Sequence, residues 1–379
     1  MAQLQAPNHH SLDAAFAALM ANGLDGEEAF SSSLKQLACE FLSAKNDGLK
    51  FLLGRNEHSA TLMQYIVVDG IVDDFSHGKL WNGKPVIKCD DIPKDAMVVN
   101  CSMSISPITA GYRLQQLGLN RCISYADLCK VRPDLIPVPT FVSEMRQDFS
   151  QNEAHWLALL AKLADKQSRT VFNDLVRYRL TANPAYMENY SIRLSEQYFE
   201  DFLALSNEVF VDAGGFNGDT TEEFCKRYPD YKKVILFEPS GINMQDAQER
   251  LANCRDINFI AHGISDAPGT LWFDPNAGSA SAVSPEGSCS VEVTTLDISV
   301  SDKVSFIKMD LEGWELKALA GAKKHIFEDH PKLAIAVYHR ASDFWRIPEY
   351  ILSTRQDYDI YLRHYTEGWS ETVMFFLPK

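Results

Sequence analysis

Short runs of apolar, often β-branched residues recur through the second half of the chain and predict strands. The runs start at residue 209 and read VFVDAG, KVILFEP, INFIAHG, TLWFD, VEVTTLD, VSFIKMD and LAIAVYH. Amphipathic segments such as TTEEFCKRY and WELKALAGAKKHIF separate most of these runs and predict helices. Strands that alternate with helices favour a mainly parallel, doubly wound α/β sheet.

The end of the chain has a different pattern. DYDIYLRHY and ETVMFFLP are strand-like runs joined by a short polar loop. Because that loop is too short to hold a crossover helix, we expect the two strands to run antiparallel to one another. The pattern therefore predicts a domain at residues 208–379 whose sheet ends in an antiparallel hairpin.

The first half of the chain divides into three predicted regions. Residues 1–50 have Leu and Ala at helical spacings and predict a helical segment. Residues 51–130 contain the short runs FLLGR, VVDGIVDD, KPVIKC, AMVVNCS and CISYADL, which predict a smaller α/β domain. Residues 131–207 begin with the proline-rich VRPDLIPVPT and continue as amphipathic helices, which predicts a helical connector.

Composition and charge narrow the class of protein. The 379 residues, 46% of them apolar, are enough for two domains. A formal net charge of −15 argues against a nucleic-acid partner, because that binding depends on Lys and Arg. The eight cysteines have no zinc spacing, and no apolar run reaches the roughly 18 residues of a membrane span. We expect a cytoplasmic protein without an integral membrane segment, and we leave formation of a homo-oligomer open.

A glycine-rich turn follows the first strand of the second half. It reads DAGGFNGD over residues 212–219. Such a turn lets the backbone approach a nucleotide, and the helix after it offers free N–H groups. Ala213 stands where the dinucleotide fingerprint GxGxxG requires a glycine. The alternative is a tight turn in which glycine only supplies a positive φ.

Polar residues also stand at the ends of the next strands. Glu238 follows VILF about 20 residues after Gly218, where nucleotide-binding folds place the acid that receives ribose hydroxyls. The alternative is a solvated acid before Pro239. The third strand ends in HGISD and the fourth in MDLEG. Because ligands lie beyond the carboxyl ends of parallel strands, we expect these loops to face one crevice, although Asp310 or Glu312 could instead cap the following helix.

In combination, these motifs resemble the FkbM family of S-adenosylmethionine (SAM)-dependent methyltransferases over residues 208–379. The resemblance rests on FVDAGGFNGDTTEEF, VILFEPS, TTLD, VSFIKMDLEGWELKALAGA and LAIAVYH. It implies a class I methyltransferase fold, SAM as the cofactor, and a cofactor-binding role for Asp212, Gly214, Gly218, Asp219, Thr220, Glu238, Pro239, His262, Ser265, Asp266 and Asp310. The sequence departs from the family pattern at Phe216, Asn217 and Ala336.

The run YLRHYTEGWSETVMFFLP resembles a family subgroup with an added N-terminal α/β domain. In this chain, that domain resembles a degenerate Rossmann half. Only Gly54 remains of the usual glycine-rich turn, and Arg55 and Glu57 stand where a pyrophosphate would need bare backbone. We therefore favour a structural, oligomerisation or substrate-presenting role for it over cofactor binding.

Methyl transfer to a neutral hydroxyl requires a base near the methyl group. His339 is the first candidate, because an imidazole titrates near neutrality, and Asp310 is the second. The alternative for His339 is a hydrogen-bonded histidine at a strand end. Asp310, Glu312 and His339 include ligand types for magnesium, but no spacing compels a metal and none is predicted. Candidate contacts to the acceptor substrate are Glu312, Arg340, Asp343, Trp345, Arg363, His364 and Trp369.

The leading functional hypothesis is a SAM-dependent O-methyltransferase. Its acceptor would be a small molecule or glycan, with a hydroxyl on a carbohydrate or a secondary metabolite. Two alternatives stay open. One is a nucleotide-dependent oxidoreductase with a modified fingerprint, and the other is a SAM-binding scaffold without catalysis.

Overall fold

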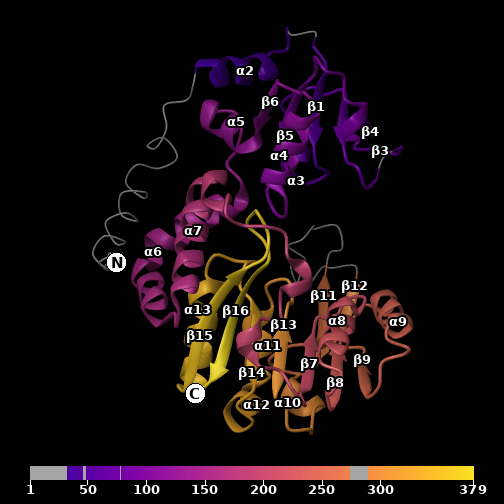
Figure 1. Ribbon diagram of the computed structural model, residues 1–379, viewed down its shortest axis with the longest axis vertical. Coiled ribbons are helices and arrows are strands. Elements are labelled where there is room, and N and C mark those ends of the chain that lie inside the picture. Colours follow the sequence, from indigo (N-terminus) through magenta and orange to yellow (C-terminus); the bar gives the residue numbers. More distant parts are fainter. Residues whose placement is uncertain (1–31, 46–47, 77, 274–288) are drawn as a thin grey trace, which may run out of the picture. The chain divides into compact units, whose positions relative to one another are not determined.

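A computed structural model describes residues 32–45, 48–76, 78–273 and 289–379. The chain divides into two compact units (Figure 1). The first contains residues up to Gln151, together with Asn173–Ile192 and Thr366–Ser370. The second contains Asn152–Phe172, Arg193–Tyr365 and Glu371–Lys379. Helices α6 (Thr140–Lys162) and α7 (Lys166–Thr181) each contribute to both units, and α6 is kinked at Asn152, where the first unit gives way to the second.

The first unit is built on a six-stranded sheet with the order β3-β4-β2-β1-β5-β6. Its strands are β1 (Lys50–Leu53), β2 (Gly70–Val72), β3 (Leu80–Trp81), β4 (Lys84–Ile87), β5 (Met97–Asn100) and β6 (Cys122–Ser124). Only β3 pairs antiparallel, and the other pairs are parallel. The helices of this unit include α2 (Ser32–Leu42), α3 (Glu57–Leu62), α4 (Pro107–Gln116) and α5 (Tyr125–Val131). The strand order reverses between β1 and β5, as it does in nucleotide-binding doubly wound sheets.

The second unit contains a seven-stranded sheet with the order β15-β16-β14-β13-β7-β8-β9. The strands are β7 (Val209–Ala213), β8 (Lys233–Phe237), β9 (Ile257–Ile260), β13 (Phe306–Met309), β14 (Lys332–Ala336), β15 (Tyr358–His364) and β16 (Thr372–Pro378). Strand β16 alone is reversed, pairing antiparallel with both β14 and β15. The predicted class I methyltransferase fold and its terminal hairpin are confirmed.

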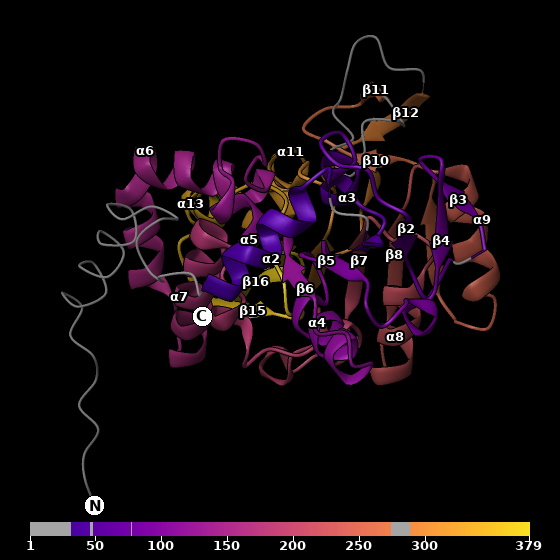
Figure 2. The same cartoon turned by 90° about the horizontal axis from the view of Figure 1, so that it is seen from above.

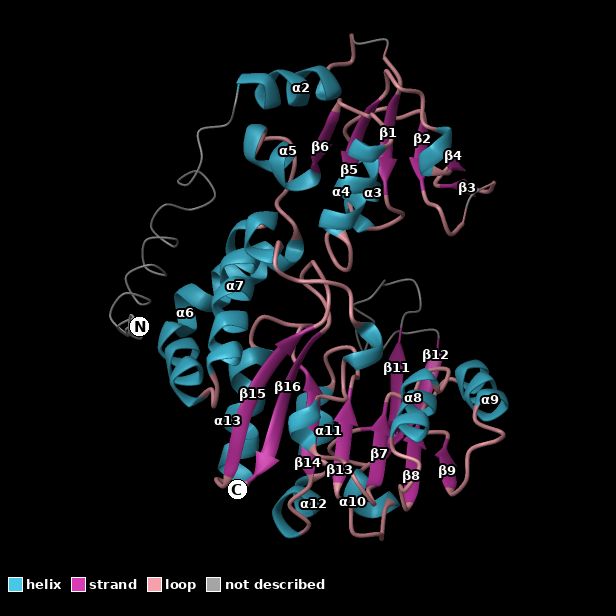
Figure 3. Ribbon diagram, viewed as in Figure 1, coloured by secondary structure: helices cyan, strands magenta, loops and turns pink. Residues whose placement is uncertain are grey.

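Helices cover both faces of this sheet (Figures 2 and 3). Helices α8 (Asp219–Arg227) and α9 (Gly241–Arg250) contact one another. Helices α10 (Leu296–Ser299), α11 (Glu315–Ala320), α12 (Lys323–Glu328) and α13 (Asp343–Thr354) form a second contacting group. On the α8 side, the rings of Phe210, Phe224 and Phe306 are fully buried against one another. Burying an aromatic side chain of this kind contributes about 1.5–3 kcal/mol, so this cluster fixes α8 against β7 and β13.

Two predicted strands do not join the main sheet. TLWFD and VEVTTLD form β11 (Gly269–Phe273) and β12 (Cys289–Thr294), which pair with β10 (Gly263–Ile264) in a separate three-stranded sheet. Their assignment to the doubly wound sheet is therefore wrong. Strand β11 runs antiparallel to β12 and follows β10 without an intervening helix, so the strand–helix alternation of the main sheet does not continue from β10 to β11.

In the described ranges, no helix is both long and apolar enough to cross a membrane.

Candidate active site

The glycine-rich turn requires glycine for reasons of space as well as conformation. Gly214 has a φ of +82°, and a Cβ atom there would clash with the carbonyl oxygen of Asp310. Gly218 has a φ of +80°, and its Cβ would lie 3.1 Å from the Cα of Ala247 in α9. The turn is therefore pressed against the end of β13 on one side and against α9 on the other.

Glu238 lies against this turn, in line with its predicted place in the site. Its carboxylate accepts hydrogen bonds from the backbone N–H of Phe216 at 3.0 Å and of Ser240 at 2.8 Å. Only 7% of the residue is exposed, and burial raises the pKa of the carboxyl. Phe216 itself has a φ of +44°, a conformation that non-glycine residues rarely adopt. Glu238 thus holds the backbone of the turn in a strained shape.

Asp212 and Lys308 form a fully buried ion pair under the turn. Their charged atoms are 3.0 Å apart, and Lys308 also donates to the carbonyl of Gly214 at 2.8 Å. Thr221 donates to the second carboxylate oxygen of Asp212 at 2.7 Å. Burial would lower the pKa of Lys308, but the neighbouring carboxylates of Asp212 and Asp310 raise it above its ordinary value. The carboxylate of Asp212 is therefore held by Lys308 and Thr221, and its direct contact with a cofactor stays a prediction.

The remaining predicted cofactor residues come from three neighbouring loops. Asp219, His262 and Asp266 are exposed, and Asp266 pairs with Lys317 at 2.6 Å. Ser265 is buried and accepts a hydrogen bond from the indole N–H of Trp314 at 3.2 Å. Two further predicted residues are partly buried, Thr220 near the start of α8 and Pro239 directly after Glu238.

A cluster of acids surrounds His339 just beyond the ends of β13 and β14. The ring nitrogen Nε2 of His339 lies 3.4 Å from Asp310 and 3.4 Å from Glu312. Nδ1 lies 3.1 Å from Glu315, which is only 1% exposed. Tyr198 donates its hydroxyl to Asp310 at 2.7 Å. The structure thus brings both predicted catalytic residues together with Glu312.

The electrostatics of this cluster decide which groups carry protons. Burial would lower the pKa of His339, but Glu315, Asp310 and Glu312 outweigh it and raise the pKa to about 9. Burial, together with nearby acids, raises the pKa of Asp343 to about 7 and that of Glu371 to about 7. At neutral pH, His339 is therefore a cation that offsets part of the surrounding negative charge.

Asp310, Glu315 and His339 each offer one metal-ligand atom, and these atoms lie within 4.8 Å of one another. Their types suit a divalent cation. The protonated imidazole already supplies positive charge at this place.

Several residues of the cluster were not identified from the sequence. Gln197 donates to Glu371 at 2.6 Å and to the hydroxyl of Tyr198 at 3.0 Å, which links Glu371 to Asp310. Glu371 has a φ of +66°, and strained backbone of this kind is concentrated at functional sites. Gln197 and Tyr198 lie far from Glu371 in the sequence, so no local pattern connects them. Glu315 lies inside a predicted helix, and no pattern in the sequence indicates its contact with His339.

The predicted acceptor residues lie in different surroundings. Arg363 is buried and pairs with Asp165 at 2.7 Å, and His364 is buried and bonds to Thr372 at 2.9 Å. The ring of Trp345 packs on His155 with centroids 4.4 Å apart. Arg340 is exposed, and its Nε would lie 3.2 Å from a Cβ on Gly313, next to the exposed Glu312. Arg340 and Glu312 thus lie beside His339, and Asp343, a further predicted contact, accepts a hydrogen bond from the backbone N–H of Arg340 at 3.1 Å.

Residues 212–365 match the profile of the methyltransferase FkbM domain. The crystal structure of methyltransferase FkbM from Methylobacillus flagellatus KT has a TM-score of 0.72 and 25% sequence identity, and the match covers 97% of this chain and 100% of that one. The likeness therefore includes the first unit as well as the second.

Other solved structures are much less similar. Fibrillarin from Aeropyrum pernix in complex with natively bound SAM has a TM-score of 0.32 at 12% identity, with coverage of 48% of this chain and 76% of that one. An rRNA methylase from Clostridium thermocellum has a TM-score of 0.34 at 10% identity, with coverage of 50% and 97%. Neither adds to the argument. No curated protein sequence matches significantly. From the fold, the glycine-rich turn and the domain match, residues 212–365 are a methyltransferase domain of the FkbM family, and SAM-dependent methylation is the reaction that this family implies.

Proposed function

We propose that this chain transfers a methyl group from SAM to a hydroxyl oxygen of a carbohydrate or of a polyol-like secondary metabolite. The proposal combines the family's reaction with the chemistry of the acid cluster. A hydroxyl acceptor has to lose a proton, whereas a thiolate or a free amine can react without that step. The observation that carries the proposal is the place of the half-buried carboxyl of Glu371, which Gln197 and Tyr198 link to Asp310 beside His339. Burial and the nearby acids raise the pKa of Glu371 to about 7, which suits it to accept that proton.

The residues of the turn are suited to hold SAM. Gly214 and Gly218 allow the positive φ angles and the close packing that shape the turn, and Glu238 lies behind the turn, directly after β8. When bound, SAM supplies a methyl group on a positively charged sulfur. The carboxyl groups of Asp310, Glu312 and Glu371 favour a nearby cation and disfavour the pyrophosphate of a dinucleotide. This charge and the missing glycine at Ala213 both argue against the oxidoreductase alternative.

The cluster residues divide the work of positioning and proton transfer. Glu371 takes the proton of the acceptor hydroxyl, and Gln197 holds its carboxylate in place at 2.6 Å. Asp310, fixed by the hydroxyl of Tyr198, accepts a hydrogen bond from the acceptor. His339 stays protonated and balances the acids, so Glu371 can ionise near neutral pH. The predicted base roles of His339 and Asp310 are therefore replaced in this proposal by roles in charge balance and orientation.

The test is a transfer assay with tritiated methyl-SAM against matched hydroxyl, amine and thiol acceptors. We expect label in hydroxyl acceptors, with kcat/KM half-maximal near a pH of about 7, where Glu371 is half ionised, and level at higher pH. Glu371→Gln should lose at least tenfold in kcat and lose the rise with pH, while Glu249→Gln on the exposed face of α9 should change neither. A rise centred near pH 9 that disappears in His339→Gln would instead identify His339 as the base. Cofactor binding without transfer to any hydroxyl would favour the scaffold alternative. The cytoplasmic location and the open question of a homo-oligomer stay at the level of sequence predictions.

A further inference from the structure

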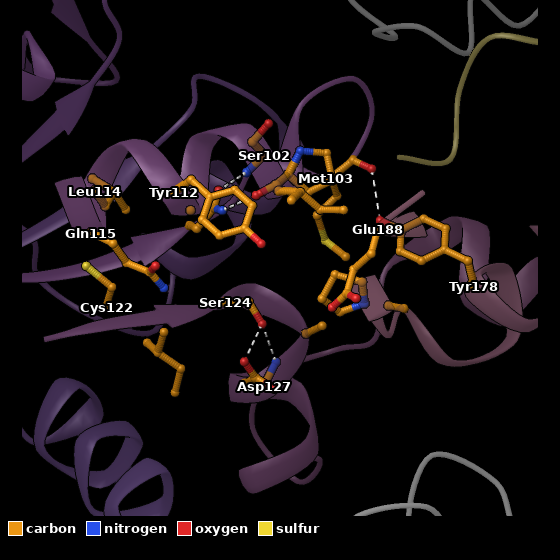
Figure 4. A pocket seen from close by; sticks show the side chains of 18 residues that line it. Ser102, Met103, Tyr112, Leu114, Gln115, Cys122, Ser124, Asp127, Tyr178 and Glu188 are labelled. Atoms are coloured by element: carbon orange, nitrogen blue, oxygen red, sulfur yellow. Dashed lines mark hydrogen bonds between the residues drawn. The ribbon is translucent and has the colours of Figure 1, made fainter. Parts of the chain in front are cut away.

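The first unit contains a cavity of about 280 Å³ that the proposed function does not use (Figure 4). It lies beyond the carboxyl ends of β5 and β6, where Asn100 and Ser124 end their strands. Helix α4 forms one wall, β6 and the start of α5 form another, and the loop after β5 and the segment from Tyr178 to Glu188 complete the lining. Every one of these residues belongs to the first unit.

The position of the cavity is one at which open α/β sheets bind ligands. The strand order of this unit reverses between β1 and β5, and ligands of such sheets lie outside the carboxyl ends near that reversal. The turn after β1 is not free to take a phosphate, however. Arg55 pairs with Asp73 at 2.5 Å, Asn56 caps α3, and Ser59 donates to the carbonyl of Gly54 at 2.6 Å. A ligand in this unit therefore has to bind on the β5 and β6 side without a phosphate-binding turn.

The walls of the cavity are held in place by hydrogen bonds of their own. The amide of Asn100 donates to the carbonyl of Pro107 at 2.9 Å and accepts from the N–H of Ser102 at 3.0 Å. Ser124 donates to the carboxylate of Asp127 at 2.6 Å, and Tyr178 donates to the carbonyl of Met103 at 3.2 Å. A cavity with walls fixed in this way is preformed, which lowers the entropic cost of binding.

The lining chemistry restricts the class of ligand. Apolar and aromatic groups dominate, among them Met103, Ile108 and Tyr112, whose ring stands beside Ser102 and above Ser124 in Figure 4. Hydroxyl, amide and carboxylate groups stand among them, but no Lys or Arg contributes to the described lining. A phosphate or sulfate would find two carboxylates, Asp127 and Glu188, and no countercharge. A neutral ring with one apolar face and several hydroxyls can pack on the apolar lining and form hydrogen bonds with the polar groups.

We propose that this cavity binds a phosphate-free sugar ring, either neutral or carrying an amine. Its volume is slightly below the range of about 300–1,000 Å³ of sites for drug-sized ligands, which suits a single ring. The apolar face of the ring packs on Tyr112, which is 58% exposed, and its hydroxyls bond to Ser102, Gln115 and Asp127. This binding is independent of methyl transfer, so it stands or falls separately from the proposed function.

Gly111 offers a matched pair of variants to test the proposal. It lines the cavity from α4, and a Cβ there would meet only the amide nitrogen of Asn100, at 3.8 Å. Gly111→Ala therefore leaves the cavity open and should stabilise the helix. Gly111→Phe fills the cavity. Tyr112→Ala is a second variant at an exposed position, where folding is not at risk, and it removes the packing face.

The experiment is saturation-transfer NMR and calorimetry on the full-length chain. The probes are glucose, galactose, glucosamine, N-acetylglucosamine, glucose 1-phosphate and adenosine, and binding of S-adenosylhomocysteine reports that the second unit is intact. We expect a phosphate-free sugar to bind the wild type and Gly111→Ala alike, and at least tenfold more weakly to Gly111→Phe and Tyr112→Ala. No sugar binding, equal binding to Gly111→Phe and Tyr112→Ala, or preference for glucose 1-phosphate or adenosine would overturn the proposal.

Discussion

Replacing Glu371 with Gln should make the second unit more stable at alkaline pH while it removes activity. A carboxyl whose pKa is higher in the folded than in the unfolded chain stabilises the fold below its unfolded pKa, and that stability is lost as the pH rises through the folded value. For Glu371, these values are the ordinary 4.5 and about 7. The difference corresponds to about 3 kcal/mol of lost stability at pH 8 and to less than about 1 kcal/mol at pH 5.

A Gln side chain has nearly the same shape and can still accept the hydrogen bond from Gln197, so the variant isolates the charge. Urea unfolding of the wild type and of Glu371→Gln at pH 5 and pH 8 measures the effect. We expect the variant to gain about 2–3 kcal/mol over the wild type at pH 8 and little at pH 5. The control Glu249→Gln, on the exposed face of α9, should show no gain at either pH. A loss of stability at pH 8 in Glu371→Gln would refute the picture of a carboxylate held at an electrostatic cost.

Three further outcomes are expected. Gly214→Ala forces a Cβ against the carbonyl of Asp310 at a φ of +82°. It should lower the free energy of unfolding of the second unit by about 3 kcal/mol or more in urea melts and abolish cofactor binding. A variant as stable as the wild type would contradict the tight packing of the turn. Lys308→Met leaves Asp212 charged and buried, which should lower the free energy of unfolding by about 3–5 kcal/mol. Adding Asp212→Asn to the same chain should restore part of that stability. Additive losses in the double variant would argue against the ion pair. His339 stabilises the fold fully below its ordinary pKa of 6.5 and loses that effect as the pH rises through about 9. The melting temperature should therefore fall over this window by more in the wild type than in His339→Gln, in which Glu371 and Asp343 still titrate.

Much of the fold could be predicted because it depends on local patterns. The apolar runs that form β7, β8, β13 and β14, and the short loop that makes β15 and β16 antiparallel, are all legible over a few residues. Because ligands lie at the carboxyl ends of parallel strands, the sequence also predicted that Asp310 and His339 belong to the same site. The same patterns predicted β11 and β12 as strands but assigned them to the wrong sheet, because an apolar run does not indicate which sheet a strand joins.

The rest of the site depends on contacts between residues distant in sequence. Glu371 directly precedes β16, and Gln197 lies before β7, so their hydrogen bond exists only in the folded chain. The protonation of His339 follows from the nearness of Glu315, and a sequence carries no measure of burial or distance. Arg363 illustrates the reverse case. Its residue type suggested a substrate contact, but the structure buries it against Asp165.

Calorimetric titration of the full-length chain with S-adenosylhomocysteine shows whether the turn after β7 and Glu238 after β8 form one cofactor site. We expect saturable one-site binding to the wild type, at least tenfold weaker binding to Glu238→Ala, and unchanged binding to Glu249→Ala. Absence of binding to the wild type, or equal affinity in Glu238→Ala, would contradict it.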